Sequence, residues 1–140
     1  MTVKESNKMP YLIIIAVFLT EYLISDIFLR DVFLPRWTSH QKYLYLWVIC
    51  LLLIHFEKHI VSFALLIGNT LGLFIGQILG DYLRAQRMLQ ITEDMEPEQV
   101  YHLGHHSGVE LWLLCILISL ILGIIIHKIK KRKAEKTLYT

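Results

Sequence analysis

Four long runs of apolar residues, separated by polar segments, set the pattern of this chain. They lie at about residues 10–30, 41–56, 60–83 and 108–127. A helix needs roughly 20 mainly apolar residues to cross the hydrocarbon core of a bilayer. The second run is short, so it must borrow polar residues from 39–42 or tilt little. The pattern therefore predicts an all-α integral membrane bundle of four transmembrane helices, which form a single polytopic domain over residues 1–140.

The boundary between the second and third runs has no residue that is typical of a turn. Residues 55–59 (His-Phe-Glu-Lys-His) include neither Gly nor Pro. A single helix over residues 43–83 would be about 60 Å long, twice the thickness of the hydrocarbon core. We therefore expect a tight hairpin at residues 55–59, with a turn near Gly68 and Asn69 as the alternative.

Composition supports a membrane protein. Apolar residues make up 55% of the 140 residues, charged residues only 19%, and the mean hydropathy is +0.51. Soluble domains contain about a quarter charged residues, and a small soluble fold could not bury so much apolar surface. The first run is not expected to be a signal peptide, because it carries Glu21 and Asp26 and no small-residue cleavage site follows it. Two cysteines are too few for a disulfide framework.

Basic residues indicate the orientation. Nine of the 14 Lys and Arg residues fall in the N-terminal tail, the hairpin and the C-terminal tail, and five fall in the other connections. The positive-inside rule then predicts that both termini are cytoplasmic, in a multi-pass protein of the plasma membrane (a cell inner membrane). We expect Trp37 and Trp112 to anchor the outer interface. The nine residues are Lys4, Lys8, Lys58, Lys128, Lys130, Lys131, Arg132, Lys133 and Lys136, and the five are Arg30, Arg36, Lys42, Arg84 and Arg87.

The longest connection, residues 84–107, is expected on the outer side with a short helix of its own. Pro97 is typical of the first turn of a helix, and Gly104 is typical of its end. Ser107 and Glu110 have the spacing of a capping box, which would set the start of the fourth span.

Small residues recur at every fourth position of the third run. In lipid, helices associate through close backbone contact, which small residues permit. The row predicts a groove filled by another helix, which comes from the same chain, from a second copy in a homo-oligomer or from a partner membrane subunit. Its members are Ala64, Gly68, Gly72, Gly76 and Gly80.

Glu21 is the most unusual polar residue within the predicted spans. It lies eleven residues after Pro10, about 16 Å into the first span at helical rise, near the midplane. An ionised carboxylate at that depth is costly, so it should be protonated, paired or exposed to water. Spans one and three both run outwards, and at equal depth Glu21 meets Asn69 and Thr70. We expect a hydrogen bond from Glu21 to one of these two residues, within one chain or across an interface.

Other polar residues continue this pattern. Gln77 and Asp81 follow Asn69 in a polar row along the third span. The amide side chains of Asn69 and Gln77 are expected either to form hydrogen bonds between helices or to line a path for a solute. Asp81 is expected to pair with the nearby Arg84. Asp26 and Arg30, four residues apart, are expected to neutralise each other.

Three histidines gather just before the fourth span, at His102, His105 and His106. Zinc takes three or four N, O or S ligands, so these histidines with Asp81 or Glu110 could hold a divalent metal. The spacing matches no specific signature, and hydrogen bonding to headgroups and water is the alternative. No other cofactor is indicated.

Three function classes remain open. The first is a small oligomeric transporter or channel for a small cation or solute, whose proton or cation site comprises Glu21, Asn69, Thr70, Gln77 and Asp81. The second is a non-catalytic accessory or scaffolding subunit of a larger membrane complex, docked through the small-residue row. A row filled within the chain would weaken both. The third is a membrane-embedded enzyme or metal-handling protein, which the lack of a P-loop, HExxH or nucleophile elbow disfavours. The basic tail favours anionic lipid over nucleic acid as a contact.

Overall fold

The protein is all-helical in a computed structural model that describes residues 8–41 and 44–138. Within these ranges the chain forms six α-helices and no strand. Lys4 and Lys42, which contribute to the predicted orientation, lie outside the described residues, as does the side chain of Lys136. The helices are α1 (Met9–Ile27), α2 (Phe33–His40), α3 (Leu44–His55), α4 (His59–Met88), α5 (Pro97–Leu103) and α6 (Gly108–Leu138).

Among the described residues, three segments are long and apolar enough to cross a membrane. They are Met9–Ile27, His59–Met88 and Pro97–Glu135, the last of which contains most of α6. The prediction of a membrane protein is therefore supported by three candidate spans. The predicted span at 41–56 is shorter than expected, because α3 has only 12 residues. Such a helix is about 18 Å long, against a hydrocarbon thickness of about 30 Å.

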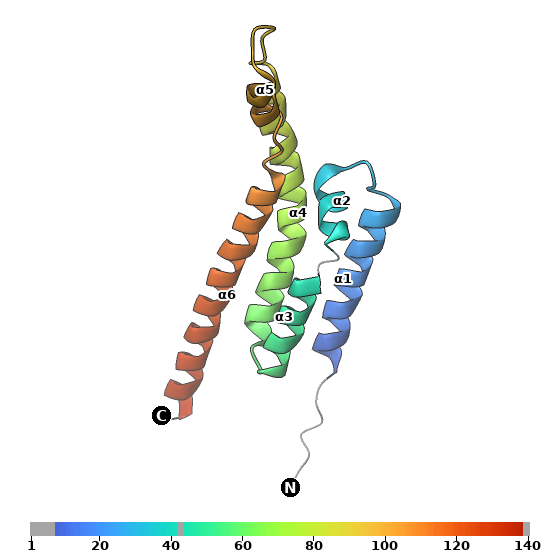
Figure 1. The fold of residues 1–140 in the computed structure, drawn as a ribbon. Coiled ribbons are helices and arrows are strands. Elements are labelled where there is room, and N and C mark those ends of the chain that lie inside the picture. Colours follow the sequence, from blue (N-terminus) through green and yellow to red (C-terminus); the bar gives the residue numbers. More distant parts are fainter. Residues whose placement is uncertain (1–7, 42–43, 139–140) are drawn as a thin grey trace.

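Of the residues 39–42 that the second span was expected to borrow, Ser39 and His40 belong to a separate short helix, α2. It follows a connection from the end of α1 and lies beside the second half of that helix (Figure 1). Pro35 sits in its first turn, where the missing backbone N–H is tolerated. Leu34 and Thr38, one turn apart, are both buried, and the Thr38 hydroxyl donates to the Leu34 carbonyl at 2.8 Å. One side of α2 therefore faces the bundle.

The chain reverses between α3 and α4, at the position where the sequence predicts a hairpin. Glu57 adopts a left-handed backbone conformation with φ of 58°. The Lys58 N–H then reaches back to the Leu53 carbonyl at 2.8 Å, which closes the end of α3. Beyond the turn the Ser62 hydroxyl donates to the Cys50 carbonyl at 2.8 Å. This reversal needs no glycine.

Three helix ends differ from the predicted spans. α1 stops at Ile27 rather than residue 30, α4 continues to Met88 rather than 83, and α6 continues to Leu138 rather than 127. The basic segment is therefore a continuation of α6 and not a separate tail. In the connection between α4 and α6, α5 begins at Pro97 and is followed by Gly104, as the sequence predicts.

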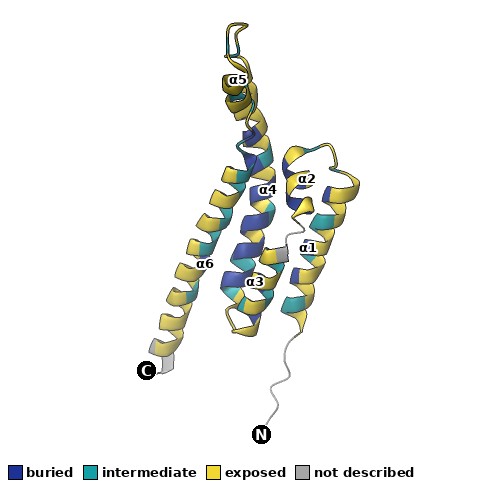
Figure 2. Cartoon of the chain, in the orientation of Figure 1, coloured by how far each residue is buried: buried dark blue, intermediate teal, exposed yellow. Residues whose placement is uncertain are grey.

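α4 is the centre of the molecule. α6 packs along one side of it, while α3 and α2 pack on the other side and separate much of α1 from it (Figure 1). Burial is concentrated along α4, whereas α6 and α1 expose apolar residues over most of their outer surface (Figure 2). The start of α1 and the end of α6 lie at the same end of the bundle.

Candidate functional site

The row of small residues on α4 faces α6 of the same chain. A Cβ added at Gly76 would lie 2.6 Å from the Gly108 carbonyl oxygen, and one at Gly68 would lie 2.6 Å from the Ser119 Cβ. Such distances are far below ordinary van der Waals contact, so only glycine permits this approach. Of the three occupants that the sequence leaves open for the groove, the structure has a helix of the same chain.

Glu21 bonds to both residues with which it was expected to make contact. The Asn69 side-chain amide donates to Glu21 Oε2 at 2.7 Å, and the Thr70 hydroxyl donates to Glu21 Oε1. Asn69 is fully buried and its Oδ1 accepts a hydrogen bond from Trp112 Nε1 at 3.0 Å. These contacts, which we call the Glu21 cluster (Glu21, Asn69, Thr70 and Trp112), join α1, α4 and α6.

The Thr70 hydroxyl has two acceptors within reach. One is Glu21 Oε1, and the other is the Leu66 carbonyl at 3.1 Å. A hydroxyl has one proton to donate and can also accept. When Glu21 is ionised, Thr70 donates to it. When Glu21 is protonated, Glu21 donates to Thr70, which turns its own proton to Leu66. The cluster therefore satisfies hydrogen bonds in both protonation states of the carboxyl group.

Gln77 belongs to a second group of contacts, about 10 Å further along α4 than Thr70 at helical rise. Its Oε1 accepts from the Leu34 backbone N–H at 2.7 Å. That N–H is one of the groups that the first turn of α2 leaves without an intrahelical partner. Gln77 Nε2 donates to Asp81 Oδ2 at 2.6 Å. The polar row predicted on the third span is thus divided, and Gln77 fixes the position of α2.

His106 completes this second group. Its ring is buried, and Gly80 and Gly108 lie so close that a Cβ on either would collide with it. Nδ1 accepts from the Gly108 N–H at 3.0 Å, and Nε2 lies 3.1 Å from Asp81 Oδ1. Phe33 of α2 packs on the ring at a centroid distance of 4.2 Å. The contacts found for Asp81 are therefore with Gln77 and His106, rather than the expected pairing with Arg84.

The remaining polar residues near the start of α6 form pairs. His105 Nε2 lies 2.7 Å from Glu110 Oε1, and the Ser107 hydroxyl accepts from Arg87. Glu110 thus bonds to a histidine instead of forming the predicted capping box with Ser107. His102 packs edge-on against Tyr101. In the described part of the chain, no three His, Cys, Asp or Glu side chains converge as a metal-ligand set.

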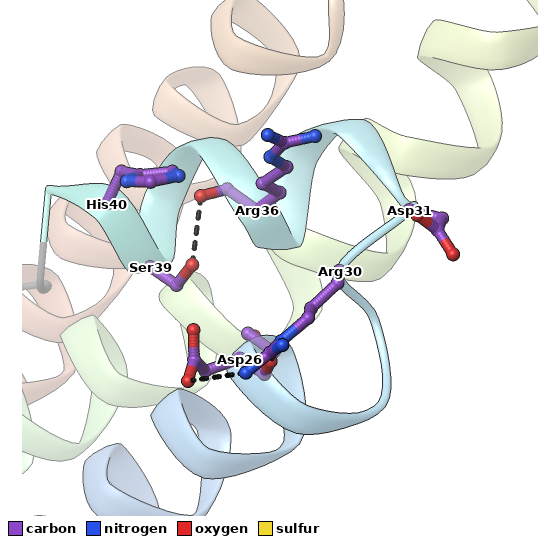
Figure 3. A pocket seen from close by; sticks show the side chains of 7 residues that line it. Asp26, Arg30, Asp31, Arg36, Ser39 and His40 are labelled. Carbon is purple, nitrogen blue, oxygen red and sulfur yellow. Dashed lines mark hydrogen bonds and ion pairs between the residues drawn. The ribbon is translucent and has the colours of Figure 1, made fainter.

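Two cavities flank the end of α1. The first, of about 340 Å³, lies between this end and α2 and is lined by polar and charged residues that include Asp26, Arg36 and His40 (Figure 3). The expected ion pair is present, with Arg30 Nη2 3.7 Å from Asp26 Oδ2. The second, of about 530 Å³, lies between α1 and α4, with mainly apolar walls that include Glu21. Ser25 lines both cavities, one helical turn from Glu21.

Two residues of these sites were not predicted. Trp112 was expected to anchor the interface with Trp37, but it bonds to Asn69 and packs against Trp37 at 6.1 Å between ring centroids. Ser25 carries no sequence signal beyond its spacing of four from Glu21. Trp112 enters its site only through the packing of α6 on α4, and Ser25 through the packing of α1 against α2 and α4. Comparison of the chain with protein-family models, with curated proteins and with solved structures found no match.

Proposed function

We propose that this protein is a small multi-pass membrane transporter or channel that moves protons or a small cation, with Glu21 as the binding site. The observation that carries the proposal is the hydrogen bonding of Glu21 within a candidate span. Asn69 holds one carboxyl oxygen, and Thr70 can either donate to the other or accept from it. A group that must load and release a proton within a membrane requires partners in both states, because unsatisfied polar groups are costly there.

In this proposal the chain crosses the membrane four times, and two successive helices, α2 and α3, make the second crossing. α2 and α3 run one after the other along the bundle and would together cross it, although α3 alone is too short. The start of α1 and the end of α6 lie at one end, which supports the placement of both termini on one side. The basic residues of α6 favour the cytoplasm of a plasma membrane for that side.

The charged cavity beside α2 offers a route to Glu21 from the opposite, outer side. Asp26, Arg36 and His40 would keep it hydrated, and Ser25 lines both this cavity and the apolar cavity that contains Glu21. Broken helices at membrane depth are tolerated where they line a cavity that contains water. Because α2 lines this cavity, we assign to the cavity the role of admitting water or ions towards the carboxylate.

The packing of α6 in the small-residue row of α4 weakens two of the functional hypotheses, the accessory subunit and the oligomeric transporter. Because α6 occupies it, the row offers no face for docking to a partner subunit, and the accessory role loses the feature on which it depended. An oligomeric transporter also loses this row as its contact surface, so association of copies would use another face. The Glu21 cluster is complete within one chain, and the proposal depends only on that cluster.

Proton flux into proteoliposomes under an imposed pH gradient tests the proposal. Glu21→Gln keeps the shape and most hydrogen bonds but removes the titratable proton, so flux should fall to the level of empty vesicles. Thr70→Val, which removes the hydroxyl, should reduce flux. Glu110→Gln is the matched control, since it makes the same change on the outer side, and it should transport normally. Undiminished flux in Glu21→Gln would remove Glu21 from the mechanism.

A further inference from the structure

The apolar cavity between α1 and α4 has one wall that differs from the rest. Among the described residues that line it, Glu21 is the one with an ionisable side chain. Ile24, Phe74 and Ile78 line the same cavity and are each at least 44% exposed. Residues that are exposed in a spanning helix face lipid. The cavity is therefore a groove that opens sideways to the bilayer, with a carboxylate inside it. We call it the α1–α4 groove.

The hydrogen bonds that are already made determine what the groove can recognise. The Thr20 hydroxyl donates to the Ala16 carbonyl at 2.7 Å, and Gln77 is bonded at both ends of its amide. The Glu21 carboxylate accepts from Asn69 and Thr70. An ionised carboxylate has about four acceptor positions, so about two remain. The groove thus offers acceptors to a ligand that carries N–H donors and a positive charge.

From this geometry we infer that the α1–α4 groove binds a lipophilic amine, whose ammonium group bonds to Glu21 and whose hydrocarbon body lies against the apolar walls. The volume of about 530 Å³ lies within the range of about 300–1,000 Å³ that is usual for small-molecule sites. A charge-assisted hydrogen bond between ammonium and carboxylate is about twice as strong as a neutral one. The apolar body would reach the site from the bilayer itself. This inference rests on the proposed function, because the amine and the proton would use the same carboxylate.

Binding of decylammonium to the full chain in phosphatidylcholine nanodiscs tests this inference. Equilibrium dialysis of the radiolabelled amine, with empty nanodiscs as background, should find saturable binding to the wild type. Glu21→Gln should weaken that binding about tenfold or more, the loss expected when a hydrogen bond to a charged group is removed. Decanol has the same chain without the charge, and it should neither bind saturably nor displace the amine.

A pair of variants tests the groove without changing the carboxylate. Ala16 lines the groove on α1, whereas Leu19 is an exposed residue of the same helix that does not line it. Ala16→Phe should fill the groove and weaken amine binding, while Leu19→Phe should bind as the wild type does. The two substitutions place the same aromatic ring on one helix, so a general effect on folding would affect both.

Three results would overturn the inference. They are the absence of saturable binding to the wild type, equal binding by Glu21→Gln, and displacement by decanol, which would identify the groove as a site for a lipid acyl chain. Different results would refute the proposed function and the inference. Proton flux that depends on Glu21 without amine binding would refute only the inference, whereas amine binding that depends on Glu21 without proton flux would refute only the proposed function.

Discussion

Replacing Gly76 with leucine should separate α4 from α6. In the structure, a Cβ at this position would meet the Gly108 carbonyl oxygen at 2.6 Å and Leu34 Cδ2 at 2.8 Å. The leucine side chain of α2 can rotate away, but the carbonyl is backbone at the start of α6. Ordinary contact begins at 3.4 Å, so the carbonyl must retreat by 0.8 Å for the first added carbon alone.

The expected cost exceeds the gain in helix propensity. Overpacking of a well-packed contact costs about 1–3 kcal/mol, occasionally more. Replacing a glycine within a helix recovers about 1 kcal/mol, because glycine is a poor helix former. Four added carbons directed at a backbone place Gly76→Leu at the high end of the cost, so we expect a net loss of about 2 kcal/mol. Gly76→Ala adds one carbon and should lie between the leucine variant and the wild type.

The two cysteines of the protein provide the assay. Cys50 is fully buried and Cys115 is half-buried, and both are free thiols. A dye that fluoresces on reaction with thiols will therefore report unfolding as the temperature rises. Gly76→Leu should unfold several degrees below the wild type. Ala85→Leu is the matched control, because it enlarges an exposed residue of the same helix, and it should unfold with the wild type.

Equal unfolding temperatures for Gly76→Leu, Ala85→Leu and the wild type would refute this reasoning. The small-residue row would then face lipid, and the contact between α4 and α6 would need another cause.

Further predictions concern the second group of contacts, around Gln77 and His106. Gln77→Leu should destabilise the protein by about 1–3 kcal/mol in the same assay, because the Leu34 N–H loses its acceptor; an unchanged unfolding temperature would contradict the role of Gln77 in holding α2. Neutral His106 should carry its proton on Nε2, since Nδ1 accepts from the Gly108 N–H and Nε2 faces Asp81. Nitrogen chemical shifts of labelled histidine distinguish the two tautomers, and a proton on Nδ1 would contradict the hydrogen bond to Gly108.

Depth along the helices was the most useful guide that the sequence offered to the candidate site. α1 and α4 rise from the same end of the bundle, and each advances 1.5 Å per residue. Counting from these ends was enough to place Glu21 opposite Asn69 and Thr70, where the structure has it. The local signals of Pro97 and Gly104 likewise give both ends of α5.

α2 could not be predicted in the same way. It has eight residues, little more than two turns, whereas hydrophobic periodicity needs a window of about 11–18 residues. Its position depends on Gln77, which is 43 residues away from Leu34. The ring of His106 is similarly placed by the space beside Gly80 on another helix. Contacts of this kind form only when helices pack, and no local pattern specifies them.

Infrared spectroscopy of Glu21 tests the central claim most directly. The claim is that this carboxyl group binds and releases a proton within the membrane part of the protein. A pH titration of the wild type in lipid should show a protonated carboxyl C=O band that disappears as the pH rises. The band should be missing in Glu21→Gln and unchanged in Glu110→Gln. A wild-type titration without any band that depends on Glu21 would contradict the account.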